Sequence, residues 1–159
     1  MRLGVDVGTV RVGVARSDPD GLLAVPVETV QRRGDVRAAV DRVLAIAAET
    51  GAVELVVGLP IALSGRDTAS TADARAVAQL LADAGPPVRL VDERLTTVSA
   101  QGALRSSGRN TRQGRQVVDQ VAAVILLQHA LDAERARGEA PGVLVEPTSS
   151  RDVAGSERK

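Results

Sequence analysis

Residues 3–17 read LGVDVGTVRVGVARS, and this stretch decides the expected fold. Two β-branched runs, residues 3–9 and 12–17, flank a glycine-containing turn, a pattern typical of a β-hairpin. In the first run Leu3, Val5 and Val7 point to one face of the strand. The acid Asp6 points to the other face, between Gly4 and Gly8. A carboxylate buried near the middle of a sheet needs a cation or strong donors nearby, whereas one on an edge strand simply lies in water.

The remainder of the chain alternates helix and strand signals. Since later strands need helical crossovers to run parallel, we predict an α/β fold with a mixed five-stranded sheet, three antiparallel strands followed by parallel strands, and helices packed on its faces. The expected elements are a third strand at 22–30, a helix from the cap Asp35 to Gly51, a strand at 53–57, a helix that starts with a capping box at Ser70–Asp73 and ends at Gly85, a strand at 88–91, and helices at 97–107 and 112–136.

The 159 residues are enough for one domain, which we expect at 1–138. The segment 139–159 is rich in Gly, Pro, Ser and charge, which favours a disordered tail, with 143–145 adding a short edge strand. No apolar run approaches the ~20 residues that cross a bilayer, and the N-terminus enters strand-like sequence without a signal-peptide core. We therefore expect a cytoplasmic protein with no membrane partner.

The composition limits the cofactors and partners. With no cysteine and one histidine, a zinc cage is disfavoured and oxygen-ligated Mg²⁺ or Mn²⁺ stays plausible. The net charge is zero, but residues 94–118 carry five arginines and no acid, so one part of the molecule is basic. Since Phe, Tyr and Trp are absent, a nucleic acid would be held by arginine and backbone amides, which favours duplex or branched substrates over splayed single strands.

Two further acids are candidates to join Asp6. Asp119 lies inside the most apolar helix, where Ala122 and Ala123 at i+3 and i+4 allow a close approach to the sheet. Glu93 directly follows the fifth strand, with its neighbour Asp92 as the alternative. Each acid on its own is also compatible with a solvated surface position. If they converge, they provide the anionic oxygens by which two divalent ions assist phosphodiester hydrolysis.

Four ordered motifs, GVDVGTVRVGVA at 4–15, VGLP at 57–60, VDERLTT at 91–97 and VDQVAAVILLQ at 118–128, resemble the YqgF/RuvX family over about residues 2–132. The resemblance implies a ribonuclease H-like fold related to RuvC-type Holliday-junction resolvases, and a nuclease that matures the 5′ end of pre-16S rRNA. Its catalytic and metal-binding acids match Asp6, Glu93 and Asp119, which would hold Mg²⁺ or Mn²⁺, as two ions. The matched substrate-binding positions are Arg11, Arg94, Thr96 and Arg115.

The natural substrate stays open at this point. The resemblance ranks pre-rRNA first, and a four-way DNA junction is also compatible with the same chemistry. Recognition of substrate shape, for instance by a homodimer, would distinguish the two.

Two other functions also fit parts of the sequence. The Asp-Val-Gly-Thr segment resembles the first phosphate loop of sugar-kinase, actin and Hsp70-type ATPases, but those proteins close two related domains on a nucleotide, and this chain has length for one. A non-catalytic ribosome-assembly module on the same fold is the other alternative, against which the intact acids argue. Finally, residues 59–69 are expected to form a mobile loop at the rim of the site.

Overall fold

The computed structural model describes residues 1–62, 64–93 and 112–148, and for residues 112–119 only the path of the backbone. The expected helix at 97–107 lies outside the described residues. The strands are β1 (Arg2–Val7), β2 (Arg11–Ser17), β3 (Ala24–Gln31), β4 (Glu54–Leu59), β5 (Val88–Asp92) and β6 (Val143–Leu144), and the helices are α1 (Val36–Thr50), α2 (Ala69–Ala84) and α4 (Arg112–Arg137).

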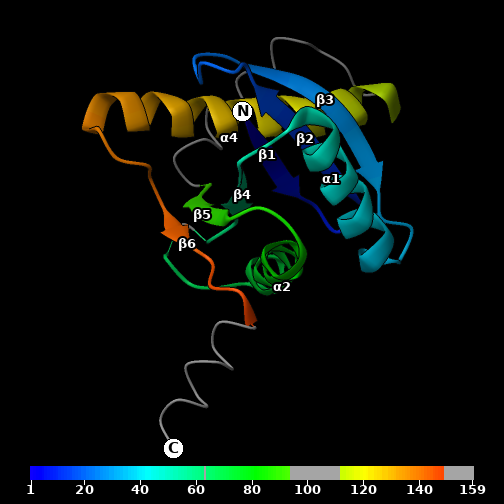
Figure 1. Ribbon diagram of the computed structural model, residues 1–159. Helices are drawn as coiled ribbons and strands as arrows, with labels where there is room; N and C mark the ends of the chain where they lie inside the picture. Colours follow the sequence, from blue (N-terminus) through cyan, green and yellow to red (C-terminus); the bar gives the residue numbers. More distant parts are fainter. Residues whose placement is uncertain (63, 94–111, 149–159) are drawn as a thin grey trace, which may run out of the picture.

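The strands form one mixed sheet in the order β3-β2-β1-β4-β5-β6 (Figure 1). The hairpin strands β1 and β2, and then β2 and β3, pair antiparallel, whereas β1, β4 and β5 run parallel. This is the predicted arrangement of three antiparallel strands followed by parallel ones. The sheet has six strands where five were expected, because β6 pairs antiparallel with the outer side of β5.

Helices cover both faces of the sheet, as predicted (Figure 1). Because side chains alternate along a strand, each face buries its own apolar set. The face under α1 and α2 is the larger core and contains Leu3, Val5, Val7, Val12, Val14, Leu55, Val57, Leu59 and Val88 from the strands. The face under α4 is narrower and contains Ala15, Val56 and Val91 from the strands, with Ala123, Leu126, Leu127, Ala130 and Leu131 from the helix.

Local sequence signals fix the ends of α1. The carboxylate of Asp35 accepts hydrogen bonds from the N–H groups of Arg37 and Ala38, which satisfies donors that the first helical turn leaves open. At the other end Gly51 adopts the left-handed conformation, with φ of 68°, and its N–H bonds back to the helix. Both ends lie where the sequence predicted them.

The start of α2 differs from the prediction. The capping box is formed by Thr68 and Thr71, two residues before the expected one at Ser70–Asp73. Thr71 is fully buried and its hydroxyl also donates to the carbonyl of Pro60, a contact with the preceding loop that sequence patterns do not reveal. This tertiary contact selects one cap among several neighbouring Ser and Thr residues.

Beyond α4 the described chain, 139–148, lies along the sheet and α2. Gly138 ends the helix with φ of 76°, β6 pairs with β5, and the N–H of Thr148 bonds Asp83 at 2.7 Å. The short edge strand expected at 143–145 is therefore present as β6. Within the described ranges no helix is both long and apolar enough to cross a membrane.

Candidate active site

Asp6 lies in the middle of the sheet, on the face that α4 covers. Its strand β1 is paired on both sides, and its apolar neighbours Val5 and Val7 belong to the opposite core. The residue opposite Asp6 on β2 is Gly13, and continuing the β1–β4 register past Val5 brings Asp6 next to Gly58. The carboxylate is thus flanked by glycine on both neighbouring strands, which leaves open space around it.

That space is filled on one side by Glu93. If Gly58 carried a Cβ atom, this atom would lie 2.7 Å from Cγ and 2.8 Å from Cδ of Glu93, so the Glu93 side chain passes directly over Gly58. The N–H of Glu93 donates to the carbonyl of Leu59 at 3.1 Å, which extends the β4–β5 pairing by one residue. The Glu93 carboxyl shares a hydrogen bond with the Asp6 carboxyl.

The pKa of Glu93 in this pair is unusually high for a carboxyl group. Burial, the hydrogen bond with Asp6, and the negative charges of Asp6 and Asp92 together raise the pKa of Glu93 to about 9. Near neutral pH the protein therefore keeps a proton between the two carboxyl groups. A divalent cation that binds here must displace this proton.

Strand β5 decides between its last residue, Asp92, and the acid that follows it, Glu93. Val91 packs in the core under α4, so alternation puts Glu93 on that face and Asp92 on the opposite one. Of the two, Glu93 shares the face of Asp6. The negative charge of Asp92 also acts on Glu93.

The helix above this face, α4, runs antiparallel to β1. At the start of β1, Arg2 forms a bidentate ion pair with Glu134, including an Nη2–Oε1 bond of 2.9 Å. Two residues further along the strand, a Cβ on Gly4 would lie 2.9 Å from the carbonyl oxygen of Ala123. The helix therefore approaches the strand backbone closely, as the small residue Ala123 predicted.

The structure describes the other predicted site residues to different extents. Arg11 opens β2 at the same end of the sheet as Asp6, and alternation with Val12 puts it on the α4 face. Asp119 and Arg115 lie on the first eight residues of α4, 112–119, where the structure describes the backbone alone. The predicted substrate contacts Arg94 and Thr96 lie outside the described residues.

The sequence profile of the RuvX family, described as Holliday junction resolvase, matches residues 1–133. The chain belongs to the RuvX family. Proteins named "Putative pre-16S rRNA nuclease" are similar over nearly the whole chain. The one from Clavibacter michiganensis is 66% identical and covers 91% of this chain and 90% of its own length, and the one from Leifsonia xyli is 62% identical and covers 92% and 95%. The resemblance predicted from the motifs is confirmed.

The fold of this RuvX chain is that of RuvC. The structure of T. thermophilus RuvC in complex with a Holliday junction substrate superposes with a TM-score of 0.55 at 19% identity, covering 89% of this chain and 98% of that one. A second Thermus thermophilus RuvC structure gives a TM-score of 0.53 at 18% identity. The predicted ribonuclease H-like fold is therefore confirmed.

The donor atoms at the RuvX site fit a hard divalent cation. Asp6 and Glu93 offer adjacent carboxyl oxygens, the ligand type that Mg²⁺ and Mn²⁺ prefer. Among the residues whose side chains are described, no group of three or more acidic, histidine or cysteine residues gathers as a complete metal site.

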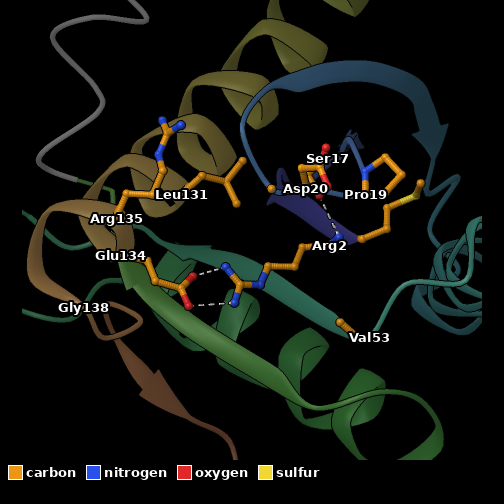
Figure 2. A pocket seen from close by; sticks show the side chains of 11 residues that line it. Arg2, Ser17, Pro19, Asp20, Val53, Leu131, Glu134, Arg135 and Gly138 are labelled. Atoms are coloured by element: carbon orange, nitrogen blue, oxygen red, sulfur yellow. Dashed lines mark hydrogen bonds and ion pairs between the residues drawn. The ribbon is translucent and has the colours of Figure 1, made fainter.

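A separate cavity of about 540 Å³ lies at the opposite end of β1 (Figure 2). The Arg2–Glu134 pair crosses it, and Ser17, buried beneath, accepts a hydrogen bond from the N–H of Arg2 at 2.9 Å. Glu54 lies 3.4 Å from Arg89 and 3.8 Å from Arg2, so the charges here balance. This cluster anchors the C-terminal half of α4 to the sheet, far along the strand from Asp6.

Sequence reasoning missed two features of the site. It noted the glycines beside Asp6 in its own strand, but not Gly13 and Gly58, which flank Asp6 on the neighbouring strands. It also gave no role to Arg32, which contacts the turn between β1 and β2. The first could have been found by aligning the three strands in register, whereas the second has no sequence signal.

Proposed function

We propose that this chain is a divalent-metal-dependent endonuclease that hydrolyses phosphodiester bonds in the 5′ processing of pre-16S rRNA, in the cytoplasm. The observation that carries the proposal is that the carboxyl groups of Asp6 and Glu93 lie side by side in the middle of the sheet, where the neighbouring strands have glycine at Gly13 and Gly58. Membership of the RuvX family and the names of its relatives support the reaction class and the substrate.

Asp119 is proposed as the third acid. From Gly4 to Asp6 the strand advances two residues, about 6.6 Å. The four residues of α4 from Ala123 to Asp119, slightly more than one turn, cover a similar distance of about 6 Å. Since Gly4 lies close to the carbonyl of Ala123 and the helix runs antiparallel to the strand, this register supports Asp119 as the third acid beside Asp6.

In this proposal Asp6, Glu93 and Asp119 together would bind two divalent ions, either Mg²⁺ or Mn²⁺. When bound, these ions would supply activation of the attacking water and stabilisation of the leaving oxygen in phosphodiester hydrolysis. The protein itself supplies the geometry: β1 fixes Asp6 between two paired strands, and Gly58 leaves the room that the Glu93 side chain occupies. Arg11, Arg94, Thr96 and Arg115 are proposed to bind the substrate backbone.

The family description and the RuvC-like fold favour one second candidate, cleavage of branched DNA. A single assay decides between the two. The purified full-length protein, with Mg²⁺ or Mn²⁺, is offered labelled pre-16S leader RNA, linear DNA duplex and a four-way DNA junction side by side. Sedimentation of the same samples tests the proposed homodimer.

We expect metal-dependent cutting of the leader RNA at a defined position, abolished by chelation and by Asp6→Asn. Preferred cutting of the junction would replace the RNA proposal with the resolvase. No metal-dependent cutting of any substrate, with the protein folded and able to bind them, would overturn the nuclease proposal in favour of a binding module.

A further inference from the structure

Arg32, the residue that follows β3, joins two parts of the molecule that are distant in sequence. Its guanidinium forms a bidentate pair with Asp73 of α2, at 2.6 Å and 3.0 Å, and also donates to the carbonyl of Gly8 at 2.8 Å. Its own N–H donates to the carbonyl of Val10 at 3.0 Å. The side chain is only 11% exposed, so these bonds are largely shielded from water.

The segment that Arg32 holds is the turn between β1 and β2, residues 8–11, which begins two residues after Asp6. The turn is tight, because the Gly8 N–H donates to the carbonyl of Arg11 at 2.9 Å and a Cβ on Gly8 would lie 2.6 Å from that oxygen. At its tip Thr9 and Val10 are exposed, Val10 by 59%. The tip therefore faces solvent while its base is fixed by Arg32.

The other partner of Arg32, Asp73, belongs to the start of α2. Two residues before Asp73 in this helix, the Thr71 hydroxyl donates to the carbonyl of Pro60, the residue that follows β4. The neighbouring carbonyl of Leu59 accepts the N–H of Glu93. Arg32 thus connects the turn that leaves Asp6 with the segment that holds the backbone of Glu93.

We propose that Arg32 and Asp73 form a clamp that positions the β1–β2 turn against the nucleic acid, so that the scissile phosphodiester lies correctly over Asp6. This inference rests on the proposed nuclease function. Arg32 is a positioning residue, because its donors are directed to Gly8, Val10 and Asp73. The exposed tip of the turn, with a hydroxyl on Thr9 and an apolar side chain on Val10, is suited to contact the sugar–phosphate backbone.

A planar guanidinium is needed for this role. It can serve the carboxylate of Asp73 and the carbonyl of Gly8 at the same time, whereas a shorter neutral side chain leaves both without their charged donor. The variant Arg32→Gln therefore releases the turn. Arg32→Lys keeps the charge, and Asp73→Asn keeps the bond to Gly8 while removing the charge of the pair.

The chain offers a matched control in Arg42 of α1. Its guanidinium forms a bidentate pair with Glu28 of β3, at 2.9 Å and 2.7 Å, which also links a helix to β3, although its side chain is more exposed, by 40%. Within the described residues its hydrogen bonds go to Glu28 and Glu49, and none goes to the β1–β2 turn. Arg42→Gln therefore tests what the loss of a bidentate ion pair between a helix and β3 does on its own.

The experiment measures the single-turnover cleavage rate of leader RNA with saturating protein, the position of the cut, and amide hydrogen exchange of residues 8–11. A rate at saturation is insensitive to a small unfolded fraction, so it separates positioning from stability. For Arg32→Gln we expect a fall of about tenfold to a hundredfold, cuts spread over neighbouring positions, and faster exchange in the turn. Arg32→Lys and Asp73→Asn should lie between it and the parent, and Arg42→Gln should keep the parental rate.

An Arg32→Gln rate and cut position within twofold of the parent, or the same rate loss in Arg42→Gln, would overturn the positioning role. Unchanged exchange in residues 8–11 would overturn the clamp itself. If the parent cuts no substrate, the nuclease proposal fails separately, and the exchange of the turn still decides whether Arg32 holds it.

Discussion

The side chain of Glu93 crosses β4 directly above Gly58, at a distance that leaves no room for a methyl group on that residue. Gly58 is therefore part of the candidate site although it carries no functional group. Its role is to let a carboxyl from β5 reach the carboxyl of Asp6 on β1, with β4 between them.

Gly58→Ala should displace Glu93 and lower the cleavage rate by about tenfold to a hundredfold, because the acid can no longer keep its place beside Asp6. The matched variant is Gly4→Ala, whose Cβ would lie 2.7 Å from the Cβ atom of Leu127 in α4. It should lower stability by about 1–3 kcal/mol through overpacking. Rates measured on folded protein, together with thermal melts, check both, and equal cleavage by Gly58→Ala and the parent would contradict the assigned place of Glu93.

Asp6→Asn should separate binding from cutting. The change keeps the size of the side chain but removes a charge that a metal ligand needs, so hydrolysis should fall by orders of magnitude. Nucleic-acid affinity should hold or rise, since one negative charge near the phosphates is lost. The cleavage rate and the Kd are measured on the same preparations, after activity has followed the protein through two orthogonal columns. If the variant is unfolded, the same test is made at Asp119, and a folded variant that cuts at the parental rate would refute the metal-nuclease proposal.

The stability of the metal-free protein should fall as pH rises through the neutral range. The pKa of Glu93 is raised from 4.5 to about 9, so between these values the folded protein holds a proton that the unfolded chain has lost. The free energy of unfolding should decrease by at most about 1.4 kcal/mol per pH unit and level off above the folded pKa. Melts in chelator at several pH values check this.

Glu93→Gln is the control for that series, because its amide cannot lose the proton and should show a flatter pH dependence than the parent. The same proton should be released into solution when Mg²⁺ or Mn²⁺ binds the parent, which titration in two buffers of different ionisation enthalpy detects. Identical pH slopes for the parent and the variant would mean that Glu93 titrates normally.

Arg11→Ala should weaken nucleic-acid binding to a similar degree for different sequences. If Arg11 contacts one phosphate, the slope of log K against log salt should become shallower by about 0.7–0.9. The same is expected of Arg94→Ala and Arg115→Ala. Binding titrations at several salt concentrations measure the slope. A change in sequence preference with an unchanged slope would mean that the residue reads bases and not the backbone.

Much of the fold follows from local patterns. The alternation around Asp6 correctly separates the two faces of β1, because a central strand must bury an apolar set on one side. Asp35 and Gly51 mark the ends of α1 because their side chain and backbone, respectively, satisfy the open groups at its ends. A short edge strand was expected from the apolar run at 143–145 in an otherwise polar segment, and the structure pairs it with β5.

The features that the sequence did not reveal depend on contacts between distant residues. The cap of α2 is chosen by the bond between Thr71 and Pro60, and Arg32 acquires its place only because Gly8 and Asp73, 24 and 41 residues away, meet at one end of the sheet. The sequence favoured Glu93 with Asp92 as the alternative, and the face on which Val91 packs now distinguishes the two. Periodicity gives the faces of an element but not its neighbours.

The two-residue strand β6 also bears on the behaviour of the protein in concentrated solution. It covers the outer side of β5, and a Cβ on Gly142 would collide with the carbonyl of Leu90, so the backbone of this segment lies flush against its neighbour. A chain shortened to residue 138 would expose the hydrogen-bonding groups of β5 as an open template for other strands. Because an edge strand of only two residues offers few such groups, we expect the residues after α4 to limit strand-to-strand association.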